Sequence, residues 1–90
     1  MDDKIGIIKV IAEEIIYLIQ KENIEDAMHL YENVFYRFLN SGDAKINEFL
    51  NNNYEPLKLI KDMLYVVPKD DTVSEEQKAE NLIIIKRLFE

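Results

Sequence analysis

Glycine and proline are scarce in this chain, and their scarcity limits the folds available to it. The ninety residues include only two glycines and two prolines. Because these residues supply most tight turns, a β-protein of this size would need many more of them. We therefore expect regular structure nearly from end to end, in helices separated by short turns.

Apolar side chains are abundant enough to pack such helices around a core. Hydrophobic residues make up 48% of the chain, which favours folding over disorder even at a net charge of −7. There is no cysteine, so neither a disulfide nor a thiolate metal site can add stability. A chain of this length makes one domain, and we predict a single helical domain over residues 1–90.

Apolar residues recur at helical spacing in five segments. Short loops between them make sequence neighbours antiparallel. The predicted fold is all-α, a compact antiparallel bundle of four main helices plus one short helix. In chain order, the predicted helices span about residues 3–21, 23–39, 43–50 (the short helix), 56–67 and 74–89.

Several local signals refine these boundaries. Asn23, Asp43 and Ser74 stand where a side-chain oxygen can accept a backbone N–H at a helix start. Ser74 and Gln77 form a capping box, in which the glutamine side chain also reaches back. Gly42 can take positive φ after the second helix, and residues 51–53, all asparagine, should stop the short helix.

Two segments have an unusual apolar pattern. The first helix has an apolar stripe wider than a surface helix needs, which predicts a central helix contacted from several sides. The run Leu82-Ile83-Ile84-Ile85 could alone be a buried strand. The capping box and the flanking charges favour a helix there.

Acidic charge is concentrated in the middle of the chain. Residues 22–76 hold twelve acids against five bases, which is the whole excess of seven. Nucleic-acid-binding domains normally carry a basic patch, and no basic run here is longer than Lys86-Arg87. A localised negative field steers basic partners and repels nucleic acid. We therefore expect a protein partner and no nucleic acid.

The sequence indicates neither a membrane span nor a secretory signal. The most apolar stretch, residues 5–19, contains Lys9, Glu13 and Glu14, and each charge would cost a few kcal/mol in lipid. Asp2 and Asp3 occupy the N-terminus, where a secretory signal needs basic residues. We expect a cytoplasmic protein that does not bind a membrane.

Residues suited to catalysis are few. His29 is the only histidine, and Asp26-x-x-His29 resembles half of a di-metal bundle motif, which needs a second histidine helix. His29 falls on the polar face of its helix, which favours a solvated side chain. Glu13 and Glu14 diverge by about 100° around a helix and do not face each other, which favours a solvated stripe over a catalytic pair. We expect no enzyme activity, no cofactor and no metal site.

Two groups of residues are candidates for binding a protein partner. Tyr36 shares the polar face of the second helix with acids, and an exposed tyrosine can be a binding hot spot. Four acids within seven residues around the start of the last helix exceed what helix capping requires, although loops are polar by default. The candidates are Glu25, Glu32 and Tyr36 in the helix and Asp70, Asp71, Glu75 and Glu76 in the loop.

One stretch resembles a known family. The run IYLIQKENIEDA at residues 16–27, followed by Tyr31 and Phe35, is similar to the opening of colicin D-type immunity proteins. The resemblance covers about a quarter of the chain, and residues 53–56 loosely match a later acidic segment of that family. It implies a small, acidic, helical bacterial protein that inhibits a tRNA-cleaving toxin by presenting acids to a basic active cleft.

These observations leave two hypotheses for the function. The first is a non-catalytic immunity protein or antitoxin that neutralises a basic nuclease toxin by covering its active cleft with acidic residues. The alternative is a helical adaptor or regulator that acts through self-association or a helical partner, with the charge serving solubility. Monomer and homodimer both remain open.

Overall fold

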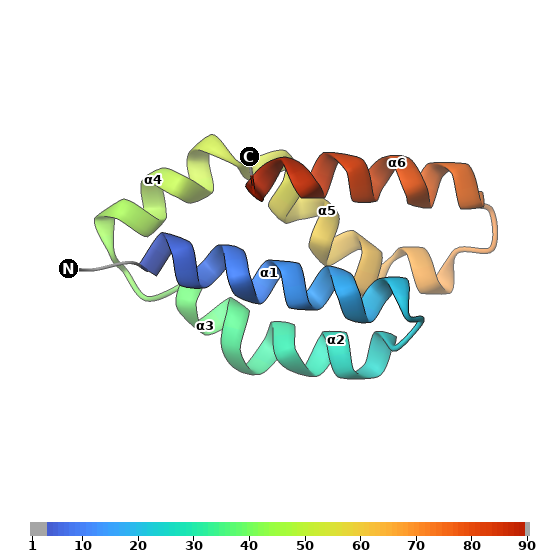
Figure 1. Ribbon diagram of the computed structural model, residues 1–90, viewed down its shortest axis with the longest axis horizontal. Helices are drawn as coiled ribbons and strands as arrows, with labels where there is room; N and C mark the ends of the chain where they lie inside the picture. Colours follow the sequence, from blue (N-terminus) through green and yellow to red (C-terminus); the bar gives the residue numbers. More distant parts are fainter. Residues whose placement is uncertain (1–3, 90) are drawn as a thin grey trace. The chain divides into compact units, whose positions relative to one another are not determined.

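The computed structural model describes residues 4–89. No strand occurs within that range, so the all-α prediction is confirmed (Figure 1). The predicted start of the first helix at residue 3 lies outside the described residues. The elements are α1 (Lys4–Gln20), α2 (Ile24–Leu30), the π-helical η1 (Tyr31–Phe35), α3 (Tyr36–Leu39), α4 (Ala44–Asn52), α5 (Tyr54–Tyr65), the 3₁₀ turn η2 (Val67–Lys69), α6 (Glu75–Lys86) and the 3₁₀ turn η3 (Arg87–Phe89).

The chain divides into two compact units between Asn52 and Asn53. Unit 1 contains α1 to α4, and unit 2 contains α5 to η3. That these units form the predicted single domain stays a prediction.

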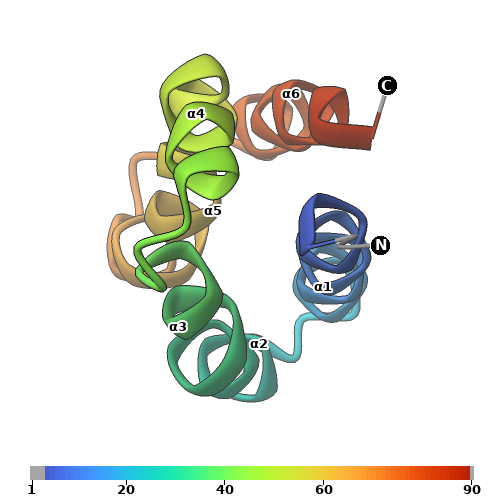
Figure 2. The same ribbon diagram turned by 90° about the vertical axis from the view of Figure 1, so that its left-hand side faces the viewer.

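In unit 1, α1 packs against α2, η1 and α4. Figure 2 looks along the helices and shows α1 opposite α2 and α3. Phe35 and Ile46 are fully buried. The sequence predicts a wide buried stripe on this helix, but two of its apolar residues, Ile7 and Tyr17, are exposed, so the buried face of α1 is narrower than expected. That buried face consists of Ile8, Ala12, Ile15, Ile16 and Ile19.

The second predicted helix is continuous from α2 to α3 but contains a π-turn. The N–H of Tyr36 donates to the C=O of Tyr31, five residues back. The buried residues of this helix, Ala27, Tyr31, Phe35 and Leu39, keep a constant spacing of four. Such a spacing drifts around an α-helix, which turns once in 3.6 residues. The wider π-turn takes up this drift, so all four side chains stay on the buried face.

Two residues of unit 1 adopt positive φ. Gly42 does so at 82°, which confirms the prediction for the turn before α4. Glu22 does so at 60°, two residues after the end of α1. The N–H groups of Glu22 and Asn23 donate to the carbonyls of Ile19 and Leu18 at 3.0 and 2.9 Å and close the helix end. Glycine is the usual residue at this position, so Glu22 carries backbone strain.

In unit 2, α5 packs against α6. The apolar residues that recur at helical spacing along α5 are buried, and Ile85 and Leu88 are the buried apolar residues of the last helix. Residues 82–85 are helical, as the flanking signals indicated. Ile83 is nevertheless 62% exposed, and the side chain of Phe89 lies outside the described part. The buried α5 stripe, continued into η2, is Leu57, Ile60, Met63, Leu64 and Val67.

The capping box at α6 is only half formed. The Ser74 hydroxyl accepts from the Gln77 N–H at 3.1 Å, as predicted. The Gln77 side chain does not reach back, because it donates to Asn81 Oδ1 at 3.0 Å. Asn81 is buried, and its Nδ2 donates to the Met63 sulfur at 3.7 Å. This polar group inside the α5–α6 contact was not predicted.

The asparagine run stops α4 later than expected. Asn51 and Asn52 still belong to α4, and Asn53 alone separates it from α5. Pro56 lies in the first turn of α5, where its missing N–H costs no hydrogen bond. The α5 helix therefore begins two residues before the predicted start.

Deleting Val34 is expected to remove the π-turn and keep the fold. The four buried residues would then follow at spacings of four, three and four, which an ordinary α-helix satisfies. We expect the free energy of unfolding to change by no more than about 1 kcal/mol. Deleting the exposed Glu13 is the control, because it rotates the rest of α1 by about 100°. Urea unfolding followed by circular dichroism gives the free energy of unfolding of both deletion variants. An equal loss of stability in the two would contradict this account of the π-turn.

Replacing Glu22 with glycine is expected to stabilise the protein. Removing the Cβ at positive φ should raise the free energy of unfolding by about 1 kcal/mol. Glu22→Ala keeps the Cβ and removes the charge, so it should give no such gain. Thermal unfolding of both variants makes the comparison, and an equal gain from alanine would mean that the charge, and not φ, is the cause.

Candidate functional site

The first candidate group is an acidic helix face, formed by Glu25, His29, Glu32 and Tyr36. Their spacings of four, three and four place them on one side of the α2–α3 helix. All four side chains are exposed. The predicted orientation of this face toward solvent is therefore confirmed.

The start of α2 separates the roles of two neighbouring acids, Glu25 and Asp26. Asn23 Oδ1 accepts from the Asp26 N–H at 3.5 Å, and Asn23 Nδ2 donates to the Asp26 carboxylate at 2.7 Å. Asp26 is thus occupied in capping. Glu25 is exposed and makes no hydrogen bond or ion pair with residues 4–89.

Tyr36 is held at the other end of the face by aromatic contacts. Its ring centroid lies 6.4 Å from that of Tyr31, which in turn lies 5.7 Å from the ring of Phe35. Tyr31 and Phe35 are buried, whereas Tyr36 remains 53% exposed. Burial, followed by the neighbouring Tyr36, raises the pKa of the Tyr31 hydroxyl. The exposed tyrosine therefore rests against a fixed core side chain.

His29 makes only local contacts. The Asn33 side-chain amide donates to the His29 carbonyl at 2.9 Å and lies 3.2 Å from His29 Nδ1. Within residues 4–89, no group of three or more histidine, aspartate or glutamate side chains is placed to hold a metal ion.

The second candidate group, called the acidic loop, consists of Asp70 and Asp71, which precede α6, and of Glu75 and Glu76, which lie in the first turn of α6. Asp70 shapes this loop, because its Oδ1 accepts from the Thr72 N–H at 2.9 Å and from the Thr72 hydroxyl at 2.5 Å. These bonds, the hydroxyl bond foremost, lower the pKa of the Asp70 carboxyl. Asp70 is half-buried, so its charge is committed to the turn.

The other three acids of the loop differ in their surroundings. Glu75 accepts from Lys78 Nζ at 3.2 Å, one helical turn along α6. Such an exposed pair contributes little to stability. Asp71 and Glu76 are exposed and have no hydrogen-bond or ion-pair partner in the described chain. They are the available charges of the acidic loop.

The candidate residues belong to different units. Glu25, Glu32 and Tyr36 lie in unit 1, and the acidic loop lies in unit 2. In unit 1 the predicted residues share one helix, whereas in unit 2 they are divided between the segment before α6 and its first turn. Each group is accordingly a candidate surface of its own.

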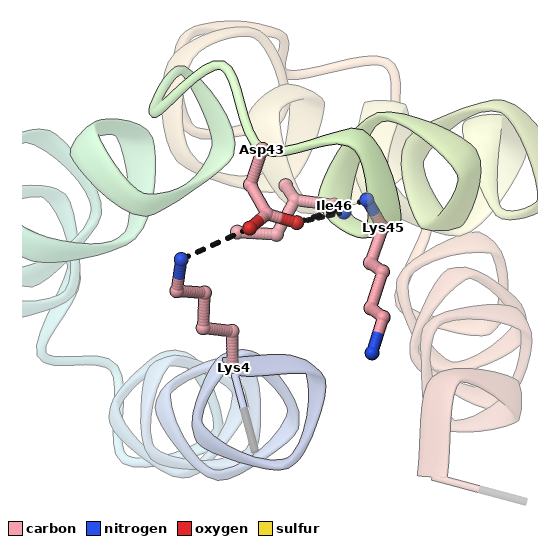
Figure 3. Close-up of polar contacts among 4 residues, drawn as sticks. All are labelled: Lys4, Asp43, Lys45 and Ile46. Atoms are coloured by element: carbon pink, nitrogen blue, oxygen red, sulfur yellow. Dashed lines mark hydrogen bonds and ion pairs between the residues drawn. The ribbon is translucent and has the colours of Figure 1, made fainter. Parts of the chain in front are cut away.

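A carboxylate that was not a candidate has the most extensive contacts. Asp43 Oδ2 accepts from Lys4 Nζ at 2.9 Å, while its Oδ1 accepts from the N–H groups of Lys45 and Ile46 at 2.9 and 3.2 Å (Figure 3). The Lys4 bond, followed by the backbone bonds, lowers the pKa of the Asp43 carboxyl. The predicted cap is confirmed, and the same residue also joins the start of α1 to the start of α4.

No helix within residues 4–89 combines the length and the apolar character that crossing a membrane requires. No protein-family model matches the chain, and no curated protein or solved structure matches it. The resemblance of residues 16–38 to colicin D-type immunity proteins stays a prediction.

Variants of Asp43 should separate its two roles. Asp43→Ser keeps a capping oxygen and loses the charge, whereas Asp43→Ala loses both, so we expect stability to fall in the order wild type, serine, alanine. The folded-state pKa lies below the unfolded value near 4. The contribution of the charge is therefore full above about pH 5 and is lost as the pH falls through the folded-state pKa.

Urea unfolding at pH 7, 5 and 3 measures this dependence. The difference in the free energy of unfolding between wild type and Asp43→Ser should be the same at pH 7 and pH 5 and should be smaller at pH 3. Lys4→Met is the control, because it breaks the same ion pair from the other side. A gap that grows on acidification would contradict the assignment.

Proposed function

We propose that this protein is a non-catalytic binding protein, an immunity protein or antitoxin that acts in the cytoplasm. In this proposal it neutralises a basic nuclease toxin by covering the active cleft with acidic side chains. The observation that carries the proposal is the acidic helix face, where Tyr36 stands exposed on the same side of one helix as Glu25 and Glu32.

Electrostatics supports a basic partner. The active cleft of a nuclease attracts the negative phosphates of nucleic acid. Exposed carboxylates carry the same negative charge as these phosphates, so the cleft attracts them as well. Glu25, Asp71 and Glu76 have no ion-pair partner within residues 4–89, so binding through these three carboxylates breaks no ion pair of the described chain. Complementary charge raises the association rate more than it raises affinity.

Affinity needs a buried anchor besides charge, and Tyr36 is suited to that role. Tyrosine is enriched among interface hot spots because it buries a large rigid surface at low entropic cost. The contact with Tyr31 holds the Tyr36 ring in place before binding. Pre-organisation of this kind lowers the cost of association.

The resemblance of residues 16–38 supports the toxin class. It spans the end of α1, the turn at Glu22 and the helix that carries the acidic helix face. In the proposed complex, the acids repel nucleic acid while they occupy its site on the toxin. No catalytic step is assigned to this chain.

The first experiment captures the partner and tests its activity. Tagged protein incubated with lysate of its own host at low salt is expected to retain a basic protein that high salt releases. The released protein should cleave RNA or DNA, and adding the wild-type chain back should stop the cleavage. A partner without nuclease activity, or a nuclease that remains active in the complex, would refute the proposal.

Charge reversal should locate the interface on the captured partner. We expect Glu25→Lys with Glu32→Lys, or Asp71→Lys with Glu76→Lys, to weaken binding by about 10- to 100-fold at low salt and by less at high salt. The controls Glu48→Lys and Glu80→Lys change exposed acids on α4 and α6. Surface plasmon resonance across a salt series measures the binding of the two double variants and the two single controls. Equal effects at candidate and control acids would remove these surfaces from the proposal.

Truncating the anchor tests the apolar part of the same interface. Tyr36→Ala is expected to weaken binding by about 30-fold, as for a hot-spot residue, mainly through faster dissociation. Tyr54→Ala is the matched control, because Tyr54 is also an exposed tyrosine at 69%. Loss of binding in the Tyr54 variant alone would place the anchor elsewhere.

A further inference from the structure

The α1 helix presents a second apolar face, directed away from its buried one. Ile7, Val10 and Tyr17 are 45%, 66% and 52% exposed, and they form the exposed α1 face. Their spacings of three and seven put them on one side of the helix. Ile11 and Leu18 border this face and are half-buried. Glu14, exposed and seven residues after Ile7, lies on the same side and interrupts this apolar surface. Exposed apolar side chains gathered on one side of a helix are a feature of association sites.

The charges along α1 indicate what kind of partner fits this face. The helix carries two lysines in its first half, Lys4 and Lys9, and two glutamates in its second half, Glu13 and Glu14. It is therefore neutral, whereas residues 22–76 hold the whole acidic excess. A uniformly basic partner would meet the lysines, and a uniformly acidic partner would meet the glutamates. A second α1 in antiparallel orientation brings unlike halves together.

We propose that two copies of this chain associate through the exposed α1 face, with the two α1 helices antiparallel. The ends of the stripe, Ile7 and Tyr17, are equidistant from position 12, so a twofold axis at that level places Ile7 of one copy beside Tyr17 of the other. Lys9 then comes within about 3 Å, measured along the helix axis, of the level of Glu13 and Glu14 in the second copy. The interface is isologous, as in most homodimers.

Lys9, Glu13 and Glu14 are available for the proposed pairing. Lys9 and both glutamates make no ion pair within residues 4–89. In a parallel pair, Lys9 would face Lys9, and the glutamates would face glutamates. The antiparallel pair brings Lys9 of each copy to the level of the glutamates of the other, which the parallel pair does not. This inference uses a surface separate from the acidic helix face and the acidic loop, and it does not rest on the proposed function.

Sedimentation equilibrium on the full chain tests the association, from about 10 µM to about 1 mM, where small interfaces associate. We expect a monomer–dimer equilibrium that Val10→Asp weakens at least about tenfold, because position 10 of one copy lies beside Glu14 of the other. Ile83→Asp is the matched control, because Ile83 is an equally exposed aliphatic residue on α6. A wild-type chain that stays monomeric, or equal loss in the two variants, would overturn the proposal and assign the face to another partner.

Single cysteines test the orientation, since the chain has none of its own. In the antiparallel pair, two Ile7→Cys residues lie roughly 15 Å apart along the axis, so this variant should not cross-link to itself. Mixed with Tyr17→Cys, it should form a disulfide-linked dimer on mild oxidation. Self-linked Ile7→Cys dimers without mixed ones would show a parallel pair and refute the model of pairing.

Charge exchange tests the partners of Lys9. The variant Lys9→Glu and the double variant Glu13→Lys with Glu14→Lys should each dimerise more weakly than wild type. A mixture of the two should form the heterodimer in preference to either homodimer, which native mass spectrometry can count. A statistical mixture of the three species would exclude the proposed contact of Lys9 with the two glutamates.

Discussion

Burial of one face of α1 is the constraint on which unit 1 depends. No disulfide is possible in this chain, so side-chain packing has to offset the entropy of ordering it. Each fully buried isoleucine, such as Ile8 or Ile15, contributes roughly 1.5–3 kcal/mol. To cover these isoleucines, the helix opposite α1 must present apolar side chains on the same side over about four turns. The π-turn between α2 and α3 meets that requirement, because it aligns side chains that recur every four residues.

The helices could be predicted from sequence because their signals are local. Asn23, Asp43 and Ser74 each accept a backbone N–H from a residue three positions ahead, so their capping role is visible in a short window. Features that depend on distant partners were missed. Lys4 donates a hydrogen bond to Asp43, 39 residues along the chain, and Asn81 donates one to Met63, 18 residues before it. No periodicity in the sequence reports such contacts.

Prediction from sequence was also incomplete for the candidate surfaces. Helical phase was enough to place Tyr36 and Glu25 toward solvent. It could not tell which acids of the loop are available, since that depends on hydrogen-bond geometry. Thr72 holds Asp70 in a turn and Lys78 neighbours Glu75, whereas Asp71 and Glu76 keep their full charge exposed. Position 22 was likewise hidden, because a glutamate gives no signal of positive φ.

The uneven distribution of charge allows the two proposed associations to respond differently to salt. Binding of a basic partner uses the acidic excess of residues 22–76, so screening weakens it. Two copies of the chain, by contrast, each carry a net charge of −7 and repel one another. Screening reduces that repulsion and leaves apolar contact along the neutral α1 helix intact. High salt therefore favours self-association over capture of a basic partner, which makes ionic strength a way to separate the two surfaces without mutation.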